Sequence, residues 1–318
     1  MTGLPSGHAW ATRLLNAMER RSGPLARSRE WLVVAEWPSF SAKFALVESG
    51  SDRVALKLGS NWNGERAAFV ADECERVRRI VESIEGGGVT MPAVYGVLAD
   101  PPALAIAYVE GQLLFESLPA LSDDEIITFM RKSGQAIGAY HRAQPASAAG
   151  SPAPFSEADL PGLARWAGVS RSTTRTMAPS LHNARRYQFS PNDLLIDNDG
   201  NIVLLDPPHF SKYDYVHRDV ATAFMEMHKN LIGARRPTGA DDTRRMYLAR
   251  EAFLAGYADT GPTSMGSEDH LAIELFVLSR VLGVAWGRIK SGQLRAGFQT
   301  LGWAFWQRGR IRAKRDLE

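Results

Sequence analysis

The segment 184–208 constrains the fold more than any other part of the sequence. It reads ARRYQFSPNDLLIDNDGNIVLLDPP, with two short apolar runs on either side of an Asn-Asp-Gly turn at 198–200. Apolar runs flanking such a turn predict a β-hairpin, because Asn, Asp and Gly adopt the required turn conformations at low cost. The two strands end on Asp197 and Asp206, and Asp193 lies just before the first strand. We expect Asp193 and Asp206 to face a cleft at the open end of the hairpin, and Asp197 to serve the turn.

Residue patterns on either side of this segment divide the chain into two parts. Between residues 31 and 110, alternating apolar runs separated by turn residues predict about five strands, and one helix is expected at 65–84. After residue 111 the periodicity is mostly helical. The pattern predicts an α+β fold, with a β-rich N-lobe at 1–110 that has a helical lead-in, and a larger helical C-lobe at 111–318. Long helices are expected in the C-lobe near 219–231, 243–257, 267–290 and 294–315.

Composition narrows the class of protein. The single cysteine, Cys74, excludes a disulfide within the chain and fits a reducing compartment. The formal net charge of +2 gives no reason to expect a nucleic-acid partner. The apolar segment 271–286 is short for a membrane span and contains Glu274 and Arg280, so we expect a buried helix and no transmembrane segment. The first residues lack the apolar run of a signal peptide, so we expect a cytoplasmic protein.

A lysine and a glutamate in the N-terminal part are candidates for an ion pair. Lys57 lies within the strand-like run VALKLG, and Glu73 falls in the middle of the apolar stripe of the helix expected at 65–84. A carboxylate on a buried helix face is costly unless a cation meets it, and Lys57 is the candidate partner. Such a pair grips the α and β phosphates of ATP in phosphoryl-transfer enzymes. The alternative is a solvated lysine and a glutamate that tilts toward water.

The two hairpin acids are candidate metal ligands. Asp193 and Asp206 would supply hard oxygen atoms, which suit a Mg²⁺ ion that keeps water and nucleotide phosphates as its remaining ligands. Asp193 also stands five residues after Gln188. Kinases have the same spacing between their catalytic Asp and their metal-binding Asn.

Together these residues resemble the aminoglycoside phosphotransferase and choline kinase family, a branch of the protein-kinase-like fold. The family loop runs His-Gly-Asp-Phe-x-Pro-x-Asn, followed by a strand, a turn and a strand ending in Asp-Phe, and RYQFSPNDLLIDNDGNIVLLDP aligns with it without a gap. AIGAYHRA is similar to the family helix that ends in Leu-His. HRDVATAF carries Asp219 at the position of a structural aspartate that braces the catalytic loop. The resemblance extends from about residue 31 to 225.

The resemblance implies a bilobal kinase-like fold, with ATP and Mg²⁺ as cofactors and a small molecule that offers a hydroxyl as acceptor. It assigns the metal to Asp193 and Asp206. It further implies nucleotide contacts at the N-lobe side chains Lys57, Glu73, Ser39 and Ser41, and at the hinge backbone of Ala107, Tyr108 and Val109.

The catalytic loop departs from the family pattern. Arg186 and Tyr187 replace His-Gly, Gln188 stands in place of the catalytic Asp, Asp193 replaces the Asn, and Pro207 replaces the aromatic residue after the metal aspartate. A side-chain amide orients an acceptor hydroxyl but cannot take its proton at neutral pH. Gln188 and Asp193 are therefore the candidate catalytic residues, with Asp193 as the carboxylate that accepts the proton.

Three functions fit this set of residues. The first is an ATP- and Mg²⁺-dependent small-molecule kinase with Gln188 at the base position. The second is a catalytically impaired pseudokinase that binds nucleotide or acts as a scaffold. The third is nucleotidyl transfer, with ATP bound in the reverse orientation in the cleft. The acceptor stays open, because the arginines from 235 to 250 suit an anionic or neutral molecule. Four acids would suit a cationic one: Glu226, Asp241, Asp242 and Glu274.

Two further features have structural interpretations. The basic stretch 308–315 predicts the solvated end of a core helix, with contact to an anionic substrate or a membrane surface as the alternative. The histidines from His141 to His228 show no metal-ligand spacing, and most are expected to be structural. The oligomeric state is open.

Overall fold

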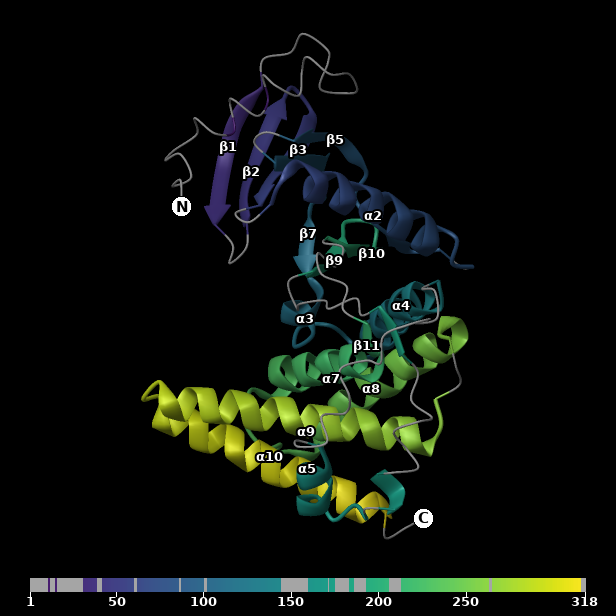
Figure 1. The fold of residues 1–318 in the computed structure, drawn as a ribbon, viewed down its shortest axis with the longest axis vertical. Coiled ribbons are helices and arrows are strands. Elements are labelled where there is room, and N and C mark those ends of the chain that lie inside the picture. The colour runs from purple at the N-terminus through teal and green to yellow at the C-terminus, as the bar shows by residue number, and fades with distance from the viewer. Residues whose placement is uncertain are drawn as a thin grey trace.

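The chain has a sheet-rich N-terminal part and a helical C-terminal part, as Figure 1 shows for the computed structural model. The α+β class predicted from the sequence is confirmed. The structure describes Ala11, Leu15 and residues 31–38, 42–59, 62–85, 87–99, 102–143, 160–170, 172–174, 183–185, 193–205, 213–262 and 265–315.

The N-terminal part contains a five-stranded antiparallel sheet with the strand order β1-β2-β3-β6-β5. Gly50 has a φ of 62° in the turn between β2 and β3, a conformation that glycine adopts without steric cost. Helix α2 packs against β5 and β6 and covers one face of the sheet. The bounds of these elements are β1 (Leu32–Pro38), β2 (Ala42–Ser49), β3 (Asp52–Gly59), α2 (Gly64–Glu82), β5 (Val94–Ala99) and β6 (Pro102–Ala107).

A second, four-stranded sheet contains the predicted hairpin. Its order is β4-β10-β9-β7, and its strands are β4 (Val89–Thr90), β7 (Gly111–Leu113), β9 (Leu194–Asp197) and β10 (Ile202–Leu204). Strands β9 and β10 pair antiparallel, as the Asn-Asp-Gly turn predicts. Asp197 Oδ1 accepts hydrogen bonds from the backbone N–H groups of Asp199 and Asn201, at 3.0 and 2.8 Å, so Asp197 is the turn residue that the sequence indicated.

One of the five strands expected between residues 31 and 110 is divided. It covers the run VTMPAVYGVLAD, whose start forms β4 in the second sheet and whose end forms β5 in the first. Pro92 lies between them and has no N–H for a sheet hydrogen bond, so it interrupts the pairing. Strand β4 pairs with β10 in parallel, so a piece of the first 110 residues completes the sheet that contains the predicted hairpin.

The C-terminal part is built from helices around one core. Helix α4 packs along α8, and α9 packs against α7 and α10 (Figure 1). A two-stranded sheet of β8 and β11 lies before α7. The bounds of these elements are α3 (Leu114–Ser117), α4 (Asp123–Arg142), α5 (Leu160–Trp166), β8 (Asn183–Arg185), β11 (Tyr213–Tyr215), α7 (His217–Ile232), α8 (Ala240–Thr260), α9 (Ser267–Lys290) and α10 (Leu294–Arg315).

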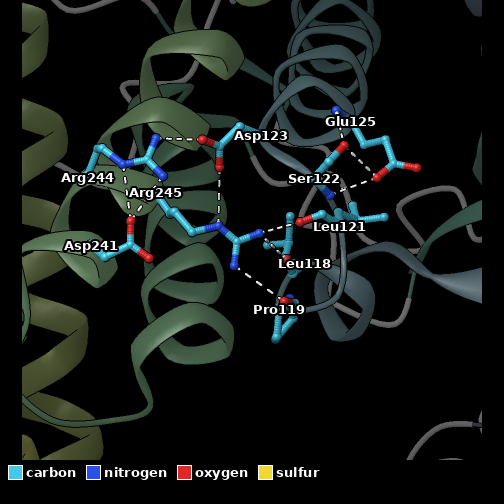
Figure 2. Close-up of polar contacts among 9 residues, drawn as sticks. All are labelled: Leu118, Pro119, Leu121, Ser122, Asp123, Glu125, Asp241, Arg244 and Arg245. Carbon is cyan, nitrogen blue, oxygen red and sulfur yellow. Dashed lines mark hydrogen bonds and ion pairs between the residues drawn. The ribbon is translucent and has the colours of Figure 1, made fainter.

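Two arginines hold the start of α8 against the corner between α3 and α4, as Figure 2 shows. Arg244 forms ion pairs with Asp123 and, at 3.0 Å, with Asp241. Arg245 pairs with Asp123 at 3.4 Å and donates to the carbonyl oxygens of the corner, among them that of Leu121. These two guanidinium groups therefore have structural partners.

Helix α9 contains the apolar segment for which we expected burial. Its buried side chains run from Ala272 to Ala285 and include Glu274. In the described part of the chain, α9 is the one helix long and apolar enough to cross a membrane by length and composition, and half of its most apolar window is buried inside the protein. Its packing between α7 and α10 matches a core helix.

His228 on α7 lies in the core between α7, α8 and α10. Its ring stacks on Trp303, with 4.0 Å between ring centroids and 5° between planes. Its Nε2 lies 2.7 Å from the carbonyl oxygen of Arg235, and its Nδ1 lies 3.2 Å from the sulfur of Met246. Burial lowers the pKa of His228 to about 3, and the positive charges of Arg250 and Arg310 act in the same direction. The imidazole is therefore neutral at neutral pH, and Nε2 donates to Arg235.

This burial predicts a loss of stability in acid. The pKa of His228 is about 3 in the folded chain and 6.5 when unfolded, so the unfolded chain binds the proton first as the pH falls. The resulting loss in the free energy of unfolding is absent above pH 6.5 and grows as the pH falls toward 3. Between pH 7 and 5 it reduces the free energy of unfolding by about 2 kcal/mol. Urea unfolding at both pH values should show a pH effect smaller by about this amount in His228→Gln. Equal pH effects in the two proteins would contradict the prediction.

Candidate functional site

Lys57 lies in the middle of β3, with β2 and β6 on its two sides. It is 3% exposed, so it is not the solvated strand lysine that was the alternative. Its ammonium group lies 5.5 Å from the ring centroids of both Phe44 and Trp62. Aromatic faces attract a cation, most strongly where water is excluded. The strand thus presents a buried positive charge on the sheet that α2 covers.

Glu73 lies on the buried face of α2, as its place in the apolar stripe predicted, and is 4% exposed. Its carboxylate accepts two hydrogen bonds from Arg76, at 2.9 Å from Nε and 2.6 Å from Nη2. These bonds raise the pKa of the Arg76 guanidinium, against the opposing effect of burial. The guanidinium also lies 5.6 Å from the ring centroid of Tyr140 on α4. Arg76 therefore links Glu73 to the C-terminal part, and the contact of Glu73 with Lys57 stays a prediction.

Asp193 stands at the open end of the hairpin, directly before β9. It is half-buried, and its carbonyl oxygen accepts a hydrogen bond of 2.8 Å from the backbone N–H of Leu205. Leu205 is the residue before Asp206. This hydrogen bond holds the two strands of the hairpin together at its open end. Other predicted site residues lie outside the described residues: Ser39, Ser41, Gln188 and Asp206.

The predicted hinge joins β6 to β7. Ala107 ends β6, and its N–H donates to the carbonyl oxygen of Ala93 at 2.9 Å, so this donor already has a protein partner. Tyr108 and Val109 are half-buried and lie between the two strands. Gly111 then begins β7, where a Cβ atom would collide with the carbonyl oxygen of Ile196 on β9. Glycine is required there because the two backbones approach so closely.

Three buried side chains connect the segments that carried the family resemblance. His141, at the end of α4, lies with Nε2 3.0 Å from Oδ2 of Asp219 and with Nδ1 2.8 Å from the hydroxyl of Tyr257. Burial raises the pKa of Tyr257 well above its usual value, and the charge of Asp219 adds to this effect. The Tyr257 hydroxyl therefore stays protonated and donates to Nδ1, so that Nε2 carries the proton donated to Asp219.

The contact between His141 and Asp219 bears on the roles predicted for Asp219 and for the histidines. Asp219 is fully buried at the start of α7, and its bracing of the catalytic loop stays a prediction, because residues 186–192 lie outside the described residues. The described histidines His141, His217 and His228 are buried and hydrogen-bonded to protein groups, which confirms their structural role.

Most acids considered for a cationic acceptor have cationic partners within the protein. Glu226 pairs with Lys229 at 3.0 Å, Asp241 pairs with Arg244, and Glu274 lies between Arg250 and Arg310 at 3.4 and 3.3 Å. These carboxylates neutralise internal or neighbouring charges. The acceptor therefore stays open.

The arrangement of the elements is that of the aminoglycoside phosphotransferases and ethanolamine kinase, which confirms the kinase-like bilobal fold. A protein from Ralstonia eutropha JMP134 assigned as an aminoglycoside phosphotransferase superposes with a TM-score of 0.60 and 15% identity, over 95% of this chain and 98% of its own. The GDP complex of aminoglycoside 2'-phosphotransferase-IIIa gives a TM-score of 0.54 and 11% identity, over 96% and 99%.

An ethanolamine kinase from Plasmodium vivax gives a TM-score of 0.53 and 10% identity, over 95% of this chain and 89% of its own. No protein-family model matches the sequence, and no curated protein matches it. The likeness is therefore one of fold.

Proposed function

We propose that the protein is an ATP- and Mg²⁺-dependent phosphotransferase that acts on a hydroxyl of a small molecule. The observation that carries this proposal is the buried ammonium of Lys57 on the central strand of the N-lobe of a kinase-like fold. A phosphate-binding lysine on the corresponding strand is a shared part of kinase sites.

The residues present fit a nucleotide and a magnesium ion. The half-buried Asp193 at the open end of the hairpin offers the oxygen atoms that Mg²⁺ prefers, and Asp206 would be its second carboxylate ligand. Bound Mg²⁺ would neutralise charge on the phosphate oxygens during transfer. The aminoglycoside 2'-phosphotransferase-IIIa of similar fold was solved with GDP, which supports nucleotide binding. GTP is therefore the second nucleotide to test beside ATP.

The remaining site residues take roles around the nucleotide. Lys57 would bind the α and β phosphates, with Ser39 and Ser41, which precede β2 in the sequence, as further contacts. The backbone of residues 107–109 would hold adenine. Gln188 would orient the acceptor hydroxyl, and Asp193 is the carboxylate proposed to take its proton.

Lys57→Met tests the proposal without adding a polar group to the core. We expect wild-type protein to gain thermal stability from ATP only when Mg²⁺ is present, by mass action. Loss of a charged hydrogen-bond donor to phosphate is worth roughly 1.5–3 kcal/mol, so Lys57→Met should bind MgATP about 10- to 100-fold more weakly. Calorimetric titration with ATP and with GTP, each with Mg²⁺ or with EDTA, measures the affinity.

Lys290→Met is the matched control, because Lys290 is exposed at the end of α9. It should bind MgATP as the wild type does. A wild-type protein that neither nucleotide stabilises in the presence of Mg²⁺ would overturn the proposal. So would equal affinities in wild type and Lys57→Met.

The pseudokinase is the second candidate function, and the amide at Gln188 is the observation in its favour. It shares nucleotide binding with the kinase and differs in transfer. A cytoplasmic location stays a prediction, as does the absence of a nucleic-acid partner.

A further inference from the structure

A cavity of about 590 Å³ lies between the segment 233–239, which follows α7, and the first half of α10. It lies at the opposite end of α7 from Asp219. Since α7 has 16 residues, the two ends are about 24 Å apart. The cavity is therefore remote from Asp219, and its lining includes none of the residues proposed for the transfer site. Its walls carry three arginines, two neutral polar side chains and an aromatic ring: Arg235, Arg236, Arg295, Thr238, Gln299 and Phe298.

The arginines give the cavity a concentrated positive charge. Arg235 is held in place, because Nε donates to the carbonyl oxygen of Ile232 at 3.0 Å and Nη1 donates to the Thr238 hydroxyl at 3.2 Å. Arg236 and Arg295 form no ion pair with any residue in the described ranges. No acidic side chain is among the described residues that line the cavity.

Other arginines of the same region behave differently. Arg244 and Arg245 bind Asp123 and the corner before α4 (Figure 2), and Arg250 is buried against Glu274. The arginines between 235 and 250 thus separate into structural ones on α8 and a pair on the cavity wall.

The wall of the cavity is fixed by contacts beneath it. The Thr300 hydroxyl lies 3.3 Å from the carbonyl oxygen of Ala234, and Nε2 of His228 donates to that of Arg235. Gly233 turns the chain into this segment with a φ of 89°. A segment held this way is already ordered before a ligand binds, which lowers the entropic cost of binding.

Helix α10 adds to the positive field. It begins at Leu294, has no acidic residue in its first turn, and carries Arg295 there. The N-terminal end of a helix is itself partly positive, so a cation in this turn is unfavourable and a bound anion would offset it.

The shape of the cavity favours an organic anion over a bare ion. Phe298 is 63% exposed and presents an apolar wall. Gly302 also lines the cavity, and a Cβ atom there would meet nothing within 4 Å, so there is open space beside the ring. The cavity is open to solvent, and its volume is in the usual range for small-molecule sites. Guanidinium groups and a hydroxyl match the several oxygens of a phosphate group.

We propose that this cavity is a second ligand site, in which Arg235, Arg236 and Arg295 bind the phosphate group of a small organic phosphate monoester. The apolar wall at Phe298 contacts the organic part of the ligand. This site is separate from the proposed phosphotransferase site and does not depend on it.

Calorimetric titration with phenyl phosphate, without nucleotide, tests the proposal. Wild type should bind phenyl phosphate, and the double variant Arg236→Ala/Arg295→Ala should bind it at least about 100-fold more weakly, at about tenfold for each charged contact. Both side chains are exposed, so the double variant should keep its fold, and a thermal unfolding curve verifies this. Arg79→Ala, which removes an exposed arginine from α2, should bind as the wild type does.

A second variant separates the phosphate contacts from the apolar wall. Gly302→Leu fills the open space without changing the charge. It should therefore weaken the binding of phenyl phosphate at least about tenfold and leave the affinity for inorganic phosphate unchanged. Phenol, which lacks the phosphate group, should not bind. Failure of wild type to bind phenyl phosphate, or equal binding by wild type and the double variant, would overturn the proposal. An unchanged affinity in Gly302→Leu would overturn the assignment of the organic part.

Discussion

Replacing Gln188 with Asp is expected to raise the rate of phosphoryl transfer by about 10²–10⁴. The wild-type amide orients a hydroxyl but has no basic form at neutral pH, and Asp193 would be a weak base while it binds the metal. A carboxylate at position 188 would accept the proton without that constraint as the bond to phosphorus forms. The expected gain corresponds to about 3–5 kcal/mol of activation free energy. Transfer depends mainly on position and metal charge, so wild type should show slow transfer rather than none.

The measurement is release or transfer of the γ-phosphate from MgATP, with water and a panel of hydroxyl compounds as acceptors. The transfer rate of Gln188→Ala should fall below that of wild type, because this variant lacks the group that orients the acceptor. Gln112→Glu is a control that adds the same charge on β7, the strand paired with β9, and should leave the rate unchanged. A Gln188→Asp variant slower than wild type would show that the amide has a role of its own. If wild type and Gln188→Asp both bind MgATP but neither transfers phosphate, the protein is a pseudokinase.

Glu274→Gln is expected to lower the free energy of unfolding by about 3–5 kcal/mol. Arg250, which is 3% exposed, lies with Nη1 3.4 Å from Glu274 Oε1, and Arg310 Nη2 lies 3.3 Å from the same oxygen. Gln307 donates to the other carboxylate oxygen. Burial lowers the pKa of Arg250 to about 10, so the guanidinium is still charged at neutral pH. Without the carboxylate, the buried Arg250 and the half-buried Arg310 have no anionic partner among the described residues.

Urea unfolding followed by circular dichroism measures the change. Glu251→Gln is the matched control, because Glu251 is exposed on the same helix as Arg250, and it should change stability by less than about 0.5 kcal/mol. The double variant Arg250→Met/Glu274→Met should be more stable than Glu274→Gln, because it removes the buried charge of Arg250 together with Glu274 and leaves only the half-buried Arg310 without its partner. A Glu274→Gln protein as stable as the control would show that Glu274 does not balance the two arginines.

Features set by local residue patterns could be predicted from the sequence. The turn at 198–200 fixed the hairpin and its register, because few other residues adopt those turn conformations at low cost. Helical periodicity of 100° per residue placed Glu73 on the buried face of α2. The same spacing rule would have found Arg76, which lies three residues after Glu73 and therefore on the same side of the helix.

Features that depend on distant contacts could not be predicted in this way. His141 and Asp219 are 78 residues apart, and only the packing of α4 beside α7 and α8 brings them together. The cavity at Arg235 and Arg295 likewise joins two segments that no local pattern connects. Strand β4 has two residues, too few to show any alternation of apolar and polar side chains.

The parallel pairing of β4 with β10 has a consequence for separating the lobes. A cut at residue 110 would leave Val89 and Thr90 on one fragment and their hydrogen-bonding partners on the other. The longer fragment would then expose an edge of the sheet that carries Asp193, and the shorter would lose the anchor for the chain between α2 and β5. Each fragment would therefore be an incomplete folding unit, and the sheet would be complete again only on reassociation of the two.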